Sequence, residues 1–305
     1  MARSVPDYRW WRPLLTVLTA AGVYCALTLI VIAVLLGVSA FVPSVAVSVD
    51  QAFSEDSDLR DPGQLAVLLG AIGLLWPAAA LGVRWGGRRP AGTLSSTAGR
   101  LRWKLFPKPL ALAALLFLAT NAVSLLVPGS TGAAGGASPG NSGAGDLWLL
   151  LLVIAVIVPI QAAAEEYAFR GLAMQVLGSW LRHPAFAILV PVPLFVLGHD
   201  YGIVGQIDVA AFAVAAGWIT WRTGGLEAAI VLHVVNNVGV LGLGAVGLGD
   251  PNATDLPLAA LPFSLAFLLA YSLLVVRWFP ATELPPSRNA EDQALPASHL
   301  QGPRR

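Results

Sequence analysis

The chain has 305 residues, of which 56% are hydrophobic and only 11% are charged. A soluble globular domain carries about a quarter charged residues, so we expect most of this chain to lie in lipid. A formal net charge of +1 argues against a nucleic-acid partner, and a single cysteine, Cys25, excludes an internal disulfide and a cysteine-rich metal site.

A helix that crosses the hydrocarbon core needs about 20 mostly apolar residues. The first such stretch is too long for the apolar core of a cleaved signal peptide, so we interpret it as an uncleaved span. The fifth is short and contains Pro191 and Pro193. The pattern predicts an all-α, polytopic transmembrane helical bundle of about eight spans. The expected spans are 14–42, 64–83, 108–127, 147–167, 185–200, 206–221, 226–244 and 257–276.

Loop charges predict the topology of the bundle. The loop after the second expected span holds seven basic residues between Arg84 and Lys108 and no acid, whereas acids dominate the loop after the first. Because short cytoplasmic loops collect Lys and Arg, we expect both termini in the cytoplasm. The chain is therefore predicted to be an integral protein of the plasma membrane, with the lipid bilayer as its surroundings.

Charged residues at the end of the fourth expected span form the first notable pattern. The stretch "AAAEEYAFRG", residues 162–171, contains Glu165, Glu166 and Arg170. Glu166 and Arg170 are four residues apart and can pair on one helix face. Glu165 is rotated by about 100° and is left free to act as a base. Alternatively, both acids simply mark the cytoplasmic end of the span.

Two further polar patterns occur in later spans. "FVLGHD" places Phe195 and His199 four residues apart, and "LHVVNN" places His233 and Asn237 on one helix face, with Asn236 pointing elsewhere. Each has a structural alternative, since polar side chains in lipid often serve helix–helix hydrogen bonding.

Together the three patterns predict one polar cavity that holds a carboxylate, two imidazoles and an amide. A carboxylate in such a site suits general-base work, an imidazole can orient water or protonate a leaving amine, and N–H groups can stabilise an oxyanion. The set is therefore chemically able to hydrolyse an amide bond.

The three patterns in this order resemble the signature motifs of the CAAX protease and bacteriocin-processing (CPBP, or Abi) family. This family of intramembrane endopeptidases includes the Ras-converting CAAX prenyl endopeptidase. The resemblance covers residues about 147 to 244, and the flanking spans fit the family's multi-helix fold. The matching motifs are Glu165-Glu166-x-x-x-Arg170, Phe195-x-x-x-His199 and His233-x-x-x-Asn237.

The resemblance implies a role for each of the residues in the first two motifs. Glu165 is similar to the catalytic glutamate that activates water, and Glu166 to its supporting acid. Arg170 and Phe195 are similar to structural supports of the site. His199 is similar to the histidine that helps to activate the water.

In the third motif, His233 and Asn237 are similar to the pair that stabilises the oxyanion. The family has also been described as zinc metalloproteases, and Glu165, His199 and His233 could supply three zinc ligands. The chain lacks the H-E-x-x-H helix of a zincin, so we favour a glutamate mechanism and commit to no cofactor, with zinc as the alternative.

These inferences divide the chain into four parts. Residues 1–127 are expected to form three N-terminal spans, 128–146 a flexible Gly/Ser-rich loop, 147–279 a catalytic core of five spans, and 280–305 a disordered tail. The expected substrate is a membrane-associated or lipid-modified peptide. The alternative is a non-proteolytic membrane protein, such as a proton-coupled transporter that uses the same residues as a relay, or a scaffold.

Overall fold

The structure is a computed structural model that describes residues 9–54, 57–130 and 144–279, apart from the side chains of residues 144 and 145. The predicted flexible loop lies mostly outside the described residues, and the predicted tail at 280–305 lies wholly outside them. The described ranges are nearly all helical and contain no β-strand. The predicted all-α transmembrane bundle is thereby confirmed.

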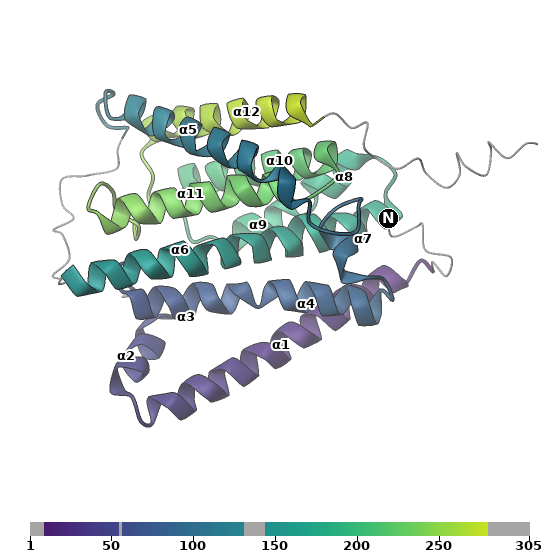
Figure 1. Cartoon of the computed structure of the whole chain (residues 1–305), viewed down its shortest axis with the longest axis horizontal. Helices are drawn as coiled ribbons and strands as arrows, with labels where there is room; N and C mark the ends of the chain where they lie inside the picture. The colour runs from purple at the N-terminus through teal and green to yellow at the C-terminus, as the bar shows by residue number, and fades with distance from the viewer. Residues whose placement is uncertain (1–8, 55–56, 131–143, 280–305) are drawn as a thin grey trace, which may run out of the picture.

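Seven helical stretches within the described ranges are long and apolar enough to cross a membrane, and a shorter apolar stretch runs from Pro184 to Leu197. Figure 1 shows these helices side by side. In chain order the helices are α1 (Arg12–Ser39), α2 (Pro43–Gln51), α3 (Pro62–Gly73), α4 (Leu75–Leu81), the π-helical turn η2 (Gly82–Gly86), the 3-10 turns η3 (Ala91–Leu94) and η4 (Trp103–Leu105), α5 (Pro107–Ser124), α6 (Ala144–Glu166), the π-helical turn η5 (Tyr167–Ala173), α7 (Met174–Trp180), α8 (Pro184–Leu189), α9 (Val192–Leu197), α10 (Ile203–Thr223), α11 (Glu227–Ala245), the 3-10 turn η6 (Leu258–Ala260) and α12 (Leu261–Trp278).

The fourth span is longer than the sequence predicts. Helix α6, the turn η5 and α7 form one stretch of 35 residues from Asp146 to Trp180, whereas the predicted span ends at residue 167. Glu165 and Glu166 therefore lie inside a long helical rod. The helix does not end at these acids, because it continues beyond them through a π-helical turn. Such turns occur frequently at functional sites.

The fifth predicted span is broken into two short helices, α8 and α9. Pro191 is the residue before α9, and Pro193 lies in its first turn. Because proline lacks a backbone N–H donor, it starts a helix more readily than it continues one. The stretch from Pro184 to Leu197 would be only about 21 Å long as one helix, which is shorter than the hydrocarbon core of about 30 Å.

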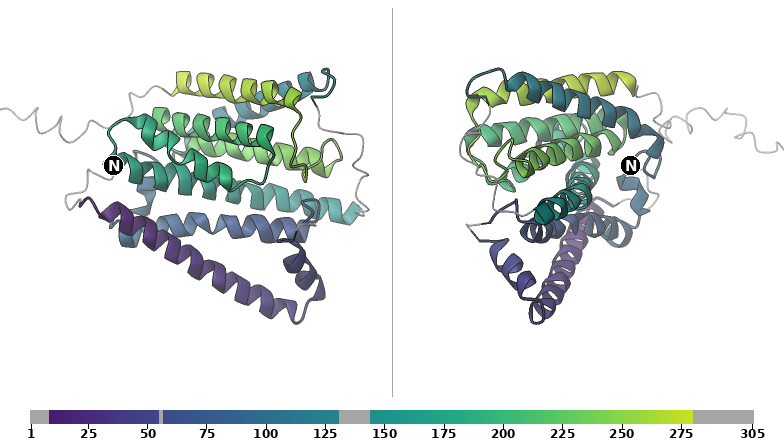
Figure 2. Two further views of the ribbon diagram at one scale, coloured as in Figure 1. Left: turned by 180° about the vertical axis from the view of Figure 1, so that it is seen from behind. Right: turned by 60° about the vertical axis from the view of Figure 1, so that its left-hand side comes forward.

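Helix α6 is the central rod of the bundle, and it packs against α3 on one side and α11 on the other. Helix α1 lies at the edge, against α4 and η2 (Figures 1 and 2). The backbones are close there, since a Cβ atom on Gly86 would lie 2.6 Å from the carbonyl oxygen of Leu15. The start of α1 and the end of α12 lie at the same end of the bundle (Figure 1).

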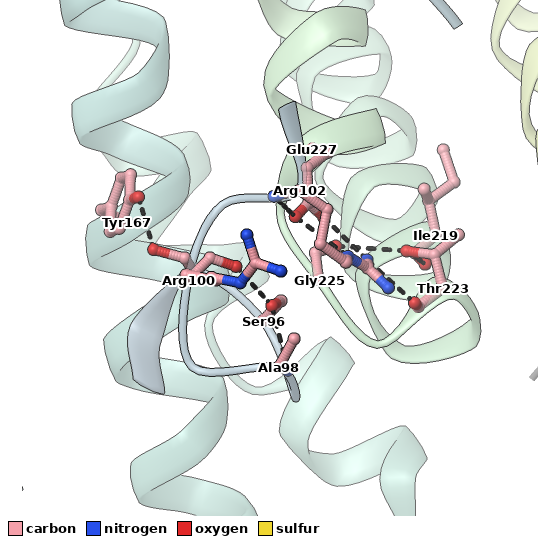
Figure 3. Close-up of polar contacts among 10 residues, drawn as sticks. Ser96, Ala98, Arg100, Arg102, Tyr167, Ile219, Thr223, Gly225 and Glu227 are labelled. Atoms are coloured by element: carbon pink, nitrogen blue, oxygen red, sulfur yellow. Dashed lines mark hydrogen bonds and ion pairs between the residues drawn. The ribbon is translucent and has the colours of Figure 1, made fainter. Parts of the chain in front are cut away.

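An ion pair between the partly buried Arg102 and the buried Glu227 ties the link between η3 and α5 to the start of α11 at this end of the bundle (Figure 3). The Arg102 backbone N–H and Nε donate to Glu227 Oε1 at 2.8 and 3.0 Å, and Nη2 donates to Oε2 at 2.8 Å. Nη2 also donates to the carbonyl oxygen of Thr223 at 3.1 Å. Glycine at position 225 leaves room for this pair, because a Cβ atom there would collide with the Glu227 carboxylate and the Arg102 guanidinium and displace them.

Further hydrogen bonds extend this attachment. The Leu226 N–H donates to the carbonyl oxygen of Ser95, and the Thr97 N–H donates to that of Gly224, both at 2.8 Å. The hydroxyls of Ser95 and Tyr167 are 2.7 Å apart, so the same link also reaches η5, one residue after Glu166. The link therefore connects the two helical stretches that carry the first and third motifs.

We predict that Arg102→Met destabilises the protein by about 3–5 kcal/mol, because it leaves Glu227 buried at 2% exposure without its cation. The measurement is thermal or denaturant unfolding in detergent. Arg100→Met, at an exposed position on the same link, is the matched control and should change stability little. Equal stability of the two variants would contradict a structural role for the Arg102–Glu227 pair.

Candidate active site

Glu166 is the junction of the polar cluster inside the bundle. It is fully buried, and its Oε1 lies 2.9 Å from Arg170 Nη1 and 2.8 Å from His233 Nδ1. A carboxylate oxygen only accepts hydrogen bonds, so Nδ1 of His233 carries the hydrogen and donates it. One carboxylate thus joins the rod of α6 and η5 to helix α11.

Arg170 extends the cluster towards α9 and α10. Its guanidinium is buried, Nη2 donates to the carbonyl oxygen of Ala213 at 3.3 Å, and the group stacks 4.4 Å from the centre of the Phe195 ring. The Phe212 ring lies 5.7 Å away. A cation over aromatic rings is favourable where water is excluded. Arg170 and Phe195 are therefore in direct contact within the cluster, and their role as structural supports stays a prediction.

Glu165 has a different environment from that of Glu166. It is 7% exposed, and Oε1 accepts a hydrogen bond from Gln161 Nε2 at 2.9 Å. Oε2 is buried, accepts no hydrogen bond from any residue that the structure describes, and lies 3.6 Å from His233 Nε2. A separation of this size can be bridged by water. Glu165 thus has one oxygen held by the protein and a second that can bind a reactant.

Asn237 joins the same cluster through a residue that the sequence analysis missed. Its Nδ2 donates to Gln161 Oε1 at 3.2 Å, and Gln161 also binds Glu165. The signal for Gln161 was present in the sequence, because it is a polar residue in an apolar span, four residues before Glu165. The prediction that Asn236 points elsewhere is wrong, since Asn236 Nδ2 donates to Asn237 Oδ1 at 3.2 Å.

His199 lies beside the cluster and contacts it through Phe195. His199 Nδ1 is 2.8 Å from the Phe195 carbonyl oxygen, and the two rings are 4.8 Å apart between centroids. The Phe195 ring also contacts the ring of His233, at 6.2 Å. Within the described residues, no hydrogen bond or ion pair joins His199 to Glu165 or His233. Because a carbonyl only accepts, Nδ1 carries the hydrogen, and neutral His199 has Nε2 available as an acceptor.

Tyr201, in the link between α9 and α10, lies beside His199. Its ring lies 6.2 Å from that of His199. Burial raises the pKa of the Tyr201 hydroxyl, and the negative charges of Asp208 and Glu165 raise it further. Tyr201 is therefore a neutral hydrogen-bond donor at physiological pH, within electrostatic reach of Glu165.

The arrangement does not fit a three-ligand zinc site. Among the described residues, no three His, Cys, Asp or Glu side chains lie close enough together to hold one metal ion. The alternative ligand set of Glu165, His199 and His233 is divided, because His199 contacts Phe195 and has no direct polar bond to the other two.

The three motifs fall within a segment that matches a known family. Residues 145–239 match the model of the type II CAAX prenyl endopeptidase Rce1-like family. This segment is Rce1-like. The resemblance predicted from the motifs is thus confirmed for this segment, and the seven apolar helical stretches support an integral membrane protein.

One curated relative matches over a longer range than the Rce1-like segment. Over 236 residues the chain is 24% identical to the uncharacterized protein YyaK of Bacillus subtilis (strain 168), and the match covers 75% of this chain and 76% of that protein. No solved structure matches the chain significantly.

The contacts of the two adjacent acids predict different effects on stability. Glu166→Gln leaves the buried Arg170 without its counter-ion and should destabilise the protein by about 3–5 kcal/mol. Glu165→Gln removes no ion pair with an arginine and should cost much less. The measurement is thermal unfolding of both variants in one detergent. A Glu165→Gln protein as unstable as Glu166→Gln would contradict this division of roles.

Proposed function

We propose that this protein is an intramembrane endopeptidase in which Glu165 activates a water molecule to hydrolyse a peptide bond. The observation that carries the proposal is the buried Glu165 Oε2, which accepts no hydrogen bond from the described residues and faces His233 Nε2 at 3.6 Å. Supporting it is the position of this carboxylate within the Rce1-like segment.

The proposed reaction begins with water bound at Glu165 Oε2. Glu165 takes a proton from the water while the water oxygen attacks the carbonyl carbon of the peptide, and the carbonyl oxygen becomes an oxyanion. Glu165 then delivers the proton to the amide nitrogen as the C–N bond breaks. An acid and an amine are released, and Glu165 returns to its ionised form.

The neighbouring groups stabilise the charge that develops. Asn237 has a second N–H on Nδ2 besides the one that binds Gln161, and it can donate to the oxyanion. His233 can donate from Nε2 when its ring is protonated, because Glu166 already holds the hydrogen on Nδ1. Neutral His199 has Nε2 as a hydrogen-bond acceptor, and it can orient the water molecule once the substrate is bound.

The apolar surroundings indicate the class of substrate. The acids lie in the interior of a 35-residue apolar stretch, so a peptide must reach them from within the bilayer or along its surface. We propose a membrane-associated or lipid-modified peptide as the substrate. We also propose that the protein resides in the plasma membrane with both termini in the cytoplasm, as the loop charges predict.

The test is cleavage of a library of membrane-associated peptides by the purified protein in liposomes. Glu165→Gln should lower kcat by at least about 10³-fold and Asn237→Ala by about 10²–10³-fold, since each removes a group that acts on the transition state. Asp146→Asn, an exposed acid at the other end of α6, is the matched control and should retain wild-type activity. Cleavage that survives Glu165→Gln would contradict the proposal, and proton-coupled transport without cleavage would favour a transporter.

Chelation separates the glutamate scheme from zinc catalysis. We expect the purified wild-type protein to keep its activity after treatment with a strong zinc chelator and dialysis. Loss of activity that added zinc restores, together with zinc bound in a fixed ratio to the protein, would contradict the metal-independent scheme.

A further inference from the structure

Gln161 is a buried polar residue that the proposed reaction does not use. It is 4% exposed, lies on α6 one helical turn before Glu165, and hydrogen-bonds both Glu165 and Asn237. We infer that Gln161 is a positioning residue that holds the general base and the oxyanion donor in one fixed arrangement. This inference rests on the proposed function and adds to it the group that sets the geometry of the site.

The direction of each hydrogen bond follows from the carboxylate. Glu165 Oε1 can only accept, so the NH₂ group of Gln161 must face it, and Oε1 of Gln161 must face Asn237. Asn237 must then donate from Nδ2, which turns its own carbonyl oxygen towards Asn236 Nδ2. The three amides form a chain in which every donor points towards Glu165.

This chain selects which atoms remain available for chemistry. Gln161 occupies Oε1 of Glu165, and Oε2 is the oxygen that accepts no hydrogen bond from the described residues. Gln161 also fixes the amide of Asn237 so that its nitrogen faces the site, with one N–H not used by Gln161. An Asn237 amide turned the other way would present an acceptor to the oxyanion and would repel it.

Gln161 also couples two helices that belong to separate motifs. Glu165 is on α6 and Asn237 is on α11, and Gln161 bridges them where these helices pack. A buried amide in an apolar bundle must satisfy its hydrogen bonds internally, and neither polar atom of Gln161 lacks a partner. A purely structural interhelical bond would stabilise the packing equally well, so the test must separate that role from positioning.

The test compares Gln161→Met and Gln161→Glu with the same changes at Gln206, an exposed glutamine on α10. Gln161→Met removes both hydrogen bonds and should lower kcat by about 10–100-fold with little change in KM, because the reacting groups lose their alignment. Gln161→Glu keeps the acceptor for Asn237 but places a second carboxylate beside Glu165. Like charges disfavour ionisation, so the acidic limb of its pH–rate profile should move to higher pH by about one unit or more. The Gln206 variants should show neither effect.

A second measurement tests the bridge independently of activity. In a double-mutant cycle of Gln161→Met and Asn237→Leu, the combined loss in melting temperature should be clearly smaller than the sum of the single losses. Wild-type kcat in Gln161→Met, an unmoved pH profile in Gln161→Glu, or additive losses in the cycle would overturn the inference. A wild-type protein without peptidase activity would overturn the proposed function instead. The double-mutant cycle would still decide whether Gln161 and Asn237 are hydrogen-bonded. If Gln161→Met fails to fold, Gln161→Glu provides the kinetic test.

Discussion

The structure depends on one carboxylate oxygen. Glu166 Oε1 accepts hydrogen bonds from Arg170 within its own helical rod and from His233 on α11. An ionised group in the interior of an apolar bundle is costly unless it is paired and hydrogen-bonded, so the rod and α11 can pack here only with these partners in place. Arg170 in turn needs the Phe195 ring and the carbonyl oxygen of Ala213, which extends the constraint to α9 and α10.

This arrangement separates the two adjacent acids by their contacts. Each acid has one buried Oε2 that accepts no hydrogen bond from the described residues, but Oε1 of Glu166 pairs with Arg170 and His233, whereas Oε1 of Glu165, on another face of the helix, binds only the amide of Gln161. A single helical register thus gives the two adjacent acids different partners, which is the basis of the different roles proposed for them. The Arg102–Glu227 pair holds the start of α11 in place, six residues before His233, and it therefore helps to fix where the imidazole meets the two acids.

The parts of this account that the sequence could predict are those with a local cause. Hydropathy gives the helices, and a spacing of four residues gives the contacts of Glu166 with Arg170 and of Phe195 with His199. The longer fourth span was not predicted, because the charges of Glu165 and Glu166 look like a span end until their partners on α11 are known. Gln161 was missed for the same reason: a polar residue in a span shows that a partner is needed, but only tertiary packing shows which residue it is. The site roles themselves remain proposals.

The most direct test of the central claim is the nitrogen NMR spectrum of histidine-labelled protein in lipid bilayers, where the whole chain contributes only four histidines. The signals of His233 are assigned by their loss in His233→Gln. The account predicts that Nδ1 of His233 is protonated and strongly hydrogen-bonded at neutral pH, and that Glu166→Gln weakens this bond while His183 and His299 are unaffected. An unprotonated Nδ1, or a His233 signal that does not respond to Glu166→Gln, would contradict the account.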